Sequence, residues 1–202
     1  MTESPAPKQD RSRIRRDIRR LRRSLGMEAR VAAEKAICRR IQNLGPYHRA
    51  RSIAVFLAFD GEPSLARLAE IAARQGKSVY APVLTRRGMF FAAVTGERPL
   101  SRNLFGIEEP DRERLVDARK LDLVLTPLVA FDRRGVRLGM GRGYYDRALR
   151  FLRHRRHWTH PKLLGVAYSF QMVDDLEQQP WDIPLWGAVT ETDTYRFAGA
   201  LE

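Results

Sequence analysis

A segment between positions 130 and 147 holds the residue types that bind phosphate. Its glycines alternate at Gly139, Gly141 and Gly143, so backbone N–H groups can approach a ligand with no Cβ in the way. Arginines, whose forked donors suit phosphate oxygens, surround these glycines at Arg137, Arg142 and Arg147. Asp146 can either interact with a helix dipole or hold a magnesium ion beside phosphates. The segment therefore predicts a site for a phosphate-bearing ligand.

The spacing of these glycines differs from both of the common nucleotide loops. A Walker loop needs Gly-Lys followed by Ser or Thr, and a dinucleotide loop needs Gly-x-Gly-x-x-Gly. Neither occurs between positions 130 and 147. A turn with a purely structural role is the alternative for the glycines taken alone. A helix expected to begin near Tyr144 would point its N-terminal amides at the same spot and complete an anion cradle.

Strand and helix patterns alternate around this segment. Continuous apolar runs predict strands that are covered on both faces, at 52–59, 121–126 and 163–168. Weaker patterns predict further strands at 77–81, 89–95 and 183–190. Amphipathic patterns predict helices at 64–75 and 144–156. The alternation favours an α/β fold with three layers, αβα, and a mostly parallel central sheet.

The N-terminal forty residues carry most of the excess charge, with thirteen Lys and Arg against five acidic residues. One helix is expected over 10–25, where arginines occupy all faces except a narrow stripe formed by Ile14, Ile18, Leu21 and Leu25. A second helix is expected over 28–44, ended by Gly45 and Pro46. We expect residues 1–10 to be a flexible leader, and residues 11–202 to form a single domain that includes this helical arm.

Such a basic arm attracts polyanions, which include nucleic acid, anionic lipid and small ligands that carry phosphate or carboxylate groups. Charge alone does not choose among them. An RNA-binding module that grips phosphates with the arginine-rich helix is therefore the alternative function. The sequence lacks the aromatic motif of the common RNA modules, so nucleic acid is the less favoured partner.

Composition excludes several classes of protein. The chain has 202 residues, a net charge of +13 and 44% hydrophobic residues, which is typical of a globular protein. No apolar run approaches the length of about 20 residues that a membrane helix needs, and the first residues lack the apolar stretch of a secretory signal. Cys38 is the single cysteine, so no internal disulfide can form and a reducing, cytoplasmic location is expected.

Segment 130–147 resembles the signature of the 5-formyltetrahydrofolate cyclo-ligase family, the methenyltetrahydrofolate synthetases. Four further blocks resemble family blocks in family order: 56–62 (FLAFDGE), 125–132 (LTPLVAFD), 165–168 (GVAY) and 179–185 (QPWDIPL). The resemblance covers about residues 11–190. The resemblance is specific because the four blocks occur in family order around a long motif.

The resemblance implies an ATP-dependent and Mg²⁺-dependent ligase. Family members close 5-formyltetrahydrofolate into 5,10-methenyltetrahydrofolate and release ADP and phosphate. Transfer of the γ-phosphoryl group to the formyl oxygen creates a good leaving group, and the nitrogen at position 10 then closes the ring. Phosphoryl transfer needs alignment and charge stabilisation rather than an activated nucleophile. The implied partners are small-molecule substrates, without a membrane, and a monomer is expected.

Roles for individual residues come from the same resemblance. The nucleotide is assigned to Arg11, Arg15, Arg137, Leu138, Gly139, Met140, Gly141, Arg142, Gly143, Tyr144 and Tyr145. The folate is assigned to Leu57, Glu62, Met140, Gly141, Arg142, Gly143 and Tyr144, and Glu62 would accept the N–H groups of the pterin ring. Mg²⁺ is assigned to Asp146 and Asp182, and catalysis to Arg142, Tyr144 and Asp146. Arg11 stands where the family often has lysine, and Arg142 where many bacterial members have glycine.

Other suggestive residues are given structural interpretations. His154, His157 and His160 are spaced by three but lie among arginines that would repel a cation, so a solvated helix end is favoured. Cys38 is interpreted as a core or flanking residue. Trp181 and Trp186 could line a folate pocket, but packing on the core is favoured.

Overall fold

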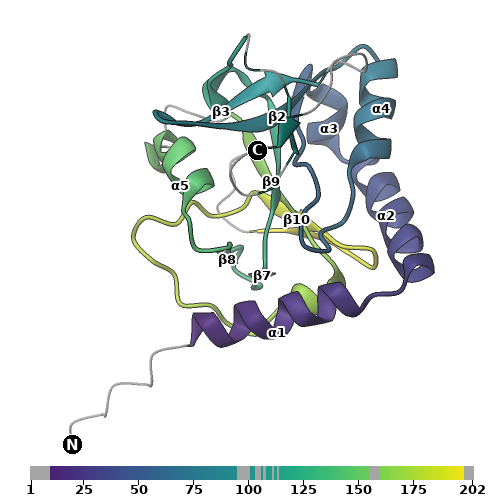
Figure 1. Cartoon of the computed structure of the whole chain (residues 1–202), viewed down its shortest axis with the longest axis vertical. Coiled ribbons are helices and arrows are strands. Elements are labelled where there is room, and N and C mark those ends of the chain that lie inside the picture. The colour runs from purple at the N-terminus through teal and green to yellow at the C-terminus, as the bar shows by residue number, and fades with distance from the viewer. Residues whose placement is uncertain are drawn as a thin grey trace, which may run out of the picture.

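A seven-stranded sheet with the order β11-β10-β9-β6-β1-β2-β3 forms the centre of the protein (Figure 1). The computed structural model describes residues 10–94, 101–102, 106, 108–110, 112, 114–154 and 160–197, so the predicted leader lies almost wholly outside the described residues. The strands of the sheet are β1 Ser52–Ala54, β2 Ser78–Thr85, β3 Gly88–Ala93, β6 Leu123–Pro127, β9 Lys162–Val166, β10 Gly187–Val189 and β11 Thr194–Arg196. Two small antiparallel pairs accompany it: β4 Ser101–Arg102 with β5 Glu108–Glu109, and β7 Ala130–Phe131 with β8 Arg137–Leu138.

The middle of the sheet is parallel. Strands β10, β9, β6, β1 and β2 pair in parallel, whereas β3 and β11 join the two edges in antiparallel fashion. The predicted α/β fold with a mostly parallel central sheet is therefore confirmed. The strand expected at 77–81 continues to Thr85 because it forms a long hairpin with β3.

Alternation of side chains along the strands builds a core on each side of the sheet. Leu123 and Leu125 of β6 join the cluster that contains Ile37 and Ile41 of α2, whereas Val124 points into the opposite cluster. Apolar residues at successive positions are therefore all buried. This pattern explains why the strand sequences read as continuous apolar runs.

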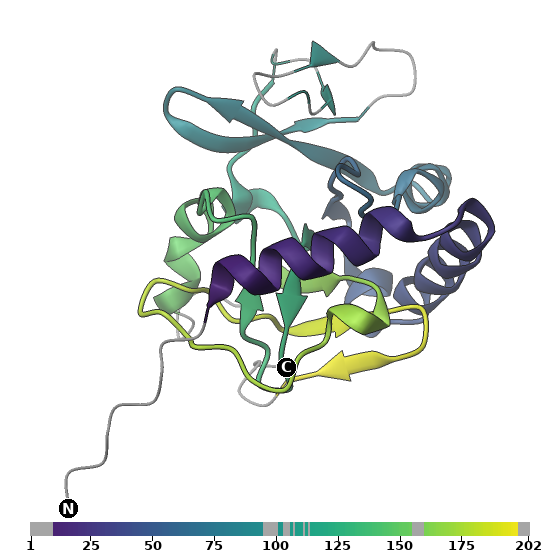
Figure 2. The same cartoon turned by 60° about the horizontal axis from the view of Figure 1, so that its bottom comes forward.

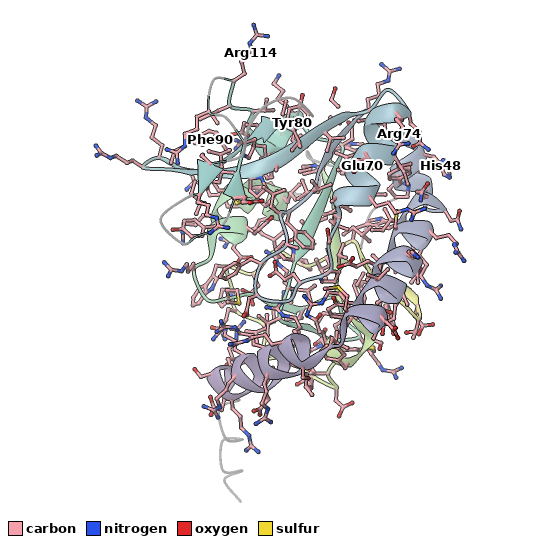
Figure 3. The ribbon with its side chains drawn as sticks, turned by 45° about the vertical axis from the view of Figure 1, so that its right-hand side comes forward. His48, Glu70, Arg74, Tyr80, Phe90 and Arg114 are labelled. Carbon is pink, nitrogen blue, oxygen red and sulfur yellow. The ribbon has the colours of Figure 1, made fainter. Side chains whose placement is uncertain are left out.

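Helices cover both faces of the sheet. The α-helices are α1 Arg11–Ser24, α2 Met27–Gln42, α3 Gly45–Arg49, α4 Ala66–Arg74 and α5 Tyr144–Ala148, with 3₁₀ turns at Ala118–Lys120, Arg150–His154 and Ser169–Gln171. Helices α2, α3 and α4 lie together on one side of the molecule and α5 lies on the other (Figure 1). On the outer side of α4, Arg74 donates a 3.2 Å hydrogen bond to Glu70 one turn earlier (Figure 3). Within the described residues, each helix is too short or too polar to cross a membrane.

Several predicted element boundaries are wrong. The strand expected at 52–59 ends at Ala54, because the chain beyond Val55 leaves the sheet toward a turn at Asp60 and Gly61, both with positive φ. The strand expected at 183–190 has three residues, and β11 was not predicted. Gly45 and Pro46 do follow the second helix, but they also begin α3, where proline suits the first turn.

The largest difference concerns the helix expected at 144–156. Helix α5 has five residues, and the chain continues as 3₁₀ turns from Arg150 to His154. A helix of barely more than one turn sums few peptide dipoles. The predicted helix start near Tyr144 is confirmed, but the predicted length is wrong, so the helix dipole available to an anion is smaller than expected.

A methyl group at Gly187 is expected to destabilise the edge of the sheet. An added Cβ would lie 2.5 Å from the backbone oxygen of Tyr195 in the paired strand β11. We expect Gly187→Ala to lower the free energy of unfolding by about 2 kcal/mol, measured by urea denaturation, because relief requires movement of the backbone.

The matched control is Gly26→Ser, which also adds a Cβ. Nothing lies within 4 Å of that position, and Gly26 caps α2 with a φ of −64°. Serine is a favourable N-cap, so the stability should be equal or higher. A Gly187→Ala protein as stable as the wild type would contradict the expectation.

Candidate functional site

The residues predicted to bind ligands gather at the carboxyl edge of the parallel strands, where α/β sheets place their sites. Leu57 and Glu62 follow β1, and the glycine-rich loop 139–143 follows the β7–β8 hairpin beyond β6. Helix α1 lies across this hairpin (Figure 2). The structure thus brings three separate parts of the sequence to one place.

Buried polar side chains hold the hairpin that carries the glycine-rich loop. Asp132 is fully buried and accepts hydrogen bonds from the backbone N–H groups of Arg134 (2.9 Å), Val136 (3.0 Å) and Leu176 (3.2 Å). Gln171, also fully buried, donates to the carbonyl oxygens that precede the hairpin, at 2.7 Å and 2.9 Å. The hairpin that leads into the glycine-rich loop is therefore fixed by buried hydrogen bonds. Neither residue was singled out from the sequence, although Asp132 ends a family block.

Arg15 ties α1 to the glycine-rich loop. Its Nε donates a 2.8 Å hydrogen bond to the carbonyl oxygen of Gly139. Gly141 has a φ of +92°, and a Cβ there would lie 3.5 Å from the Arg15 guanidinium carbon. The positive φ requires glycine at this position. Arg142 and Met140 are exposed beside it, so the loop presents both backbone and cation to solvent.

Arg15 donates to this loop and has no carboxylate partner among the described residues, and a second cation, Arg11, lies nearby. Burial, and next the charge of neighbouring Arg11, lower the pKa of the Arg15 guanidinium. Like charges held together in this way favour an anionic ligand between them. Arg11 also lies 3.7 Å from an Asp182 carboxylate oxygen.

The predicted metal ligands Asp146 and Asp182 are 36 positions apart in the sequence but lie near each other in the structure. Asp146 accepts hydrogen bonds from the Arg137 guanidinium and, at 3.4 Å, from the backbone N–H of Ile183. Asp182 accepts a 3.0 Å hydrogen bond from the Gln179 N–H. Arg137 is 5% exposed and also donates to the Ile183 carbonyl oxygen. This guanidinium therefore links the end of the glycine-rich loop to the segment that carries Asp182.

Glu62 is a buried carboxyl group beside the Arg22 guanidinium. Its Oε2 accepts a 3.1 Å hydrogen bond from the Phe59 N–H, and its Oε1 lies 3.5 Å from Arg22 Nη1. Burial raises the pKa of Glu62 to about 7, against the lowering influence of Arg22. Burial and the charge of Glu62 together raise the pKa of Tyr145 above its usual range, which places Tyr145 near Glu62.

Arg22 is the main site-forming residue that sequence reasoning missed. Its side chain is fully buried, with Nη1 3.4 Å from the Leu128 carbonyl oxygen and Nη2 3.0 Å from Asp60. The available signal was spacing. Arg22 follows Arg15 by seven residues and Arg11 by eleven, so the three share one face of a helix.

The other residues predicted to contact ligands differ in how far their side chains are buried. Leu138 is fully buried in β8, so a ligand could meet it through its backbone alone. Tyr144 is half-buried, with the Arg147 guanidinium 5.0 Å from the centre of its ring. Leu57 is half-buried on the other side of the site, and Gly143 has a φ of +63° that requires glycine.

The structural interpretations given to Cys38, the tryptophans and the histidines are confirmed only in part. Cys38 and Trp186 pack in the core as predicted. Core packing is wrong for Trp181, which is 56% exposed because it lies in the irregular segment before β10. His157 lies outside the described residues, while His154 and His160 are exposed. Across the described ranges, His, Cys, Asp and Glu form no group of three or more suited to a metal.

Comparisons with known proteins identify the family to which the chain is similar. The model of the 5-formyltetrahydrofolate cyclo-ligase family matches residues 7–191. Curated relatives named 5-formyltetrahydrofolate cyclo-ligase, from Haemophilus influenzae and Escherichia coli, are each 37% identical, and cover 88% and 89% of this chain and 96% and 100% of their own. The solved structure of Aquifex aeolicus 5,10-methenyltetrahydrofolate synthetase has a TM-score of 0.82 and 28% identity over 96% of both chains.

The fold and these comparisons therefore define an α/β enzyme of the ligase class. The chain belongs to the 5-formyltetrahydrofolate cyclo-ligase family.

The raised pKa of Glu62 predicts a pH-dependent stability. The folded pKa is about 7 and the ordinary value is 4.5, so the folded state binds the proton more tightly between these values. The associated stability is fully present below pH 4.5 and is lost as the pH rises through 7. Glu62→Gln avoids this loss, so at pH 8 it should be more stable than the wild type by as much as ~3 kcal/mol.

Urea denaturation at pH 8 and pH 5 measures this gain, which should shrink at the lower pH. Arg22 keeps Asp60 and the Leu128 carbonyl oxygen as partners in the variant. Glu70→Gln on the exposed side of α4 is the control (Figure 3) and should show no such pH dependence. A Glu62→Gln protein that is less stable than the wild type at pH 8 would contradict the burial argument.

Proposed function

We propose that this protein uses ATP and Mg²⁺ to convert 5-formyltetrahydrofolate into 5,10-methenyltetrahydrofolate, with release of ADP and phosphate. One observation supports this most directly. Helix α1 binds the glycine-rich loop through Arg15 at one end, with Arg11 nearby, and places Arg22 beside the buried Glu62 at the other. An anion site and a site for N–H donors therefore adjoin along a single helix, as a reaction between ATP and a folate requires.

The triphosphate would lie against loop 139–143. The alternating glycines leave its amides accessible, and Arg11, Arg15 and the exposed Arg142 supply positive charge. Arg137 has a different role in this proposal. Its side chain is buried against Asp146 and the Ile183 carbonyl oxygen, so it positions the loop relative to the Asp182 segment.

Asp146 and Asp182 fit the needs of Mg²⁺, which commonly takes one or two carboxylates together with substrate phosphates. The Asp146 contacts described above both use its Oδ1, and those of Asp182 both use its Oδ2. Within the part of the chain that the structure describes, the second oxygen of each carboxylate makes no hydrogen bond or ion pair and is available to a ligand. A bound ion would supply neutralising charge for the phosphates.

The pterin ring would be held at Glu62 beside Leu57. An ionised carboxylate accepts two N–H donors from a flat ring, and Arg22 stabilises that charge from the other side. Tyr145, whose raised pKa keeps its phenol protonated, lies near Glu62. It therefore connects the folate end of the site with the start of α5.

Alignment and charge stabilisation are what these residues offer to the reaction. The formyl oxygen attacks the γ-phosphorus and the bond to ADP breaks. The nitrogen at position 10 then attacks the formyl carbon and loses its proton, and phosphate leaves with the electrons of the carbon–oxygen bond. Arg142 and Tyr144 are proposed to contact the transferring group, and Asp146 to hold the loop and ion in register.

RNA binding by the arginine-rich helix receives no support from the structure. Many guanidiniums of α1 are committed to acceptors of the same chain: Arg11, Arg13, Arg15, Arg19, Arg20, Arg22 and Arg23. Intramolecular pairing leaves fewer cations to neutralise phosphates. A cytoplasmic monomer that acts on small molecules is therefore the proposed form of the protein.

Methenyltetrahydrofolate absorbance measures the proposed activity directly. Folded protein with 5-formyltetrahydrofolate, ATP and Mg²⁺ should form product, and no product would contradict the proposal. Asp146→Asn should lower kcat by about 100-fold or more, because the carboxylate proposed to hold Mg²⁺ beside the phosphates is lost.

The control for that variant is Asp117→Asn. Asp117 pairs with Arg119 within its own turn, away from the glycine-rich loop in sequence, and its replacement should leave kcat within twofold of the wild type. Equal losses in the two variants would indicate a general effect of removing a carboxylate and would count against a role for Asp146.

A further inference from the structure

The turn before Glu62 contains a second acidic residue, Asp60, which the proposed function does not use. Asp60 has a φ of +52° and Gly61 a φ of +77°. A left-handed backbone is uncommon in residues other than glycine, although aspartate tolerates it. The Asp60 side chain is 8% exposed, so the turn holds a carboxylate in an enclosed place.

Three arginines of α1 converge on this carboxylate. Arg19 Nε lies 2.6 Å and Arg22 Nη2 3.0 Å from Asp60 Oδ2, and Arg23 Nε lies 3.1 Å from Oδ1. Burial alone would raise the pKa of Asp60, but Arg19 and Arg22 lower it below its ordinary value. The carboxylate is therefore ionised and bound firmly to the C-terminal half of the helix.

Arg22 is shared between Asp60 and Glu62. Its Nη2 pairs with Asp60, while its Nη1 lies 3.5 Å from Glu62 Oε1 and 3.4 Å from the Leu128 carbonyl oxygen. Helix and turn are also in close contact, since a Cβ at Gly61 would lie 3.1 Å from the Arg22 carbonyl oxygen. The Arg22 guanidinium thus cannot change its position without affecting both carboxylates.

The charged groups around Glu62 come from three elements. Helix α1 supplies Arg22 and Arg19, the turn supplies Asp60, and α5 supplies the protonated Tyr145. Arg22 and Arg19 favour the ionised form of Glu62, whereas Asp60 disfavours it. Without Asp60, the full charge of Arg22 would be free to bind the Glu62 oxygens that the pterin needs.

We propose that Asp60 is a positioning residue for the folate site: it holds Arg22 to itself and so leaves the Glu62 carboxylate available to the N–H donors of the substrate. This inference rests on the proposed function, because it takes Glu62 as the acceptor for the pterin ring. Asp60 acts through Arg22 and does not touch the substrate.

Steady-state kinetics of Asp60→Asn between pH 6 and 9 test the inference. The KM for 5-formyltetrahydrofolate should rise about tenfold, as expected when a charged hydrogen bond to substrate is displaced. The kcat and the KM for ATP should stay within about twofold, a split that general loss of structure would not give. The pH below which the folate KM rises should move lower, because the pKa of Glu62 falls when a neighbouring negative charge is removed.

A second variant predicts the opposite shift and keeps the Asp60 carboxylate itself, together with its ion pair to Arg22. Arg19 and Arg23 are partly exposed, so the double variant Arg19→Gln, Arg23→Gln should fold even if Asp60→Asn does not. It removes Arg19, which favours ionised Glu62, and leaves Arg22 as the one arginine of the three that still pairs with Asp60. The pH below which the folate KM rises should therefore move higher.

Asp17→Asn is the matched control. Asp17 also pairs with two arginines of α1, Arg13 at 3.8 Å and Arg20 at 3.6 Å, but it makes these contacts within the helix. Its replacement should leave the folate KM and its pH profile unchanged. Wild-type behaviour of Asp60→Asn, or a shift in the same direction for both arginine and aspartate variants, would overturn the inference. A wild-type protein that shows no folate turnover would overturn the proposed function as well.

Discussion

Buried positive charge on one face of α1 is the constraint on which the site depends. A guanidinium removed from water costs several kcal/mol unless acceptors surround it, and Arg22 is fully buried while Arg11 and Arg15 are largely covered. The acceptors they find are parts of the site itself: a loop carbonyl, Asp182 and the turn that carries Glu62. The helix is thereby fixed across the β7–β8 hairpin, where Ile14 and Ile18 add apolar contact.

The same arrangement explains why the site needs the whole fold. The turn of Glu62 follows β1, the glycine-rich loop follows the hairpin after β6, and Asp182 precedes β10. Parallel pairing of β1 and β6 brings the first two segments to one edge of the sheet, and Arg137 joins the third to them through Asp146 and the Ile183 carbonyl oxygen. Asp132 and Gln171 then fix the hairpin through buried hydrogen bonds. The positively charged helix α1 thus lies over the site that these segments form.

Much of the fold could be predicted from the sequence because its strands are buried on both faces. Residues such as Leu123, Val124 and Leu125 form a continuous apolar run that few other structures produce. Element boundaries were harder to predict: β11 is short and largely exposed, and α5 stops after five residues although the amphipathic pattern of the sequence continues beyond it. The glycine-rich loop was found from its residue types, since alternating glycines among arginines have few purely structural uses.

Long-range pairing within the site could not be predicted from spacing. Nothing in the sequence relates Asp146 to Asp182, which meet through Arg137 and the Ile183 N–H; the family resemblance alone suggested the pair. The sequence does not distinguish Arg22 from the many other arginines of this helix. Its burial depends on pairing with Asp60, whose left-handed backbone cannot be predicted from the sequence. Polar residues that support a site are in general set by the tertiary partners they meet.

A crystal structure with a non-hydrolysable ATP analogue, Mg²⁺ and 5-formyltetrahydrofolate tests the central claim most directly. The triphosphate should lie between the amides of residues 139–143 and the guanidiniums of Arg11 and Arg15, with the pterin ring on Glu62. A nucleotide bound at another edge of the sheet, with this loop and these arginines making no contact to it, would contradict the account.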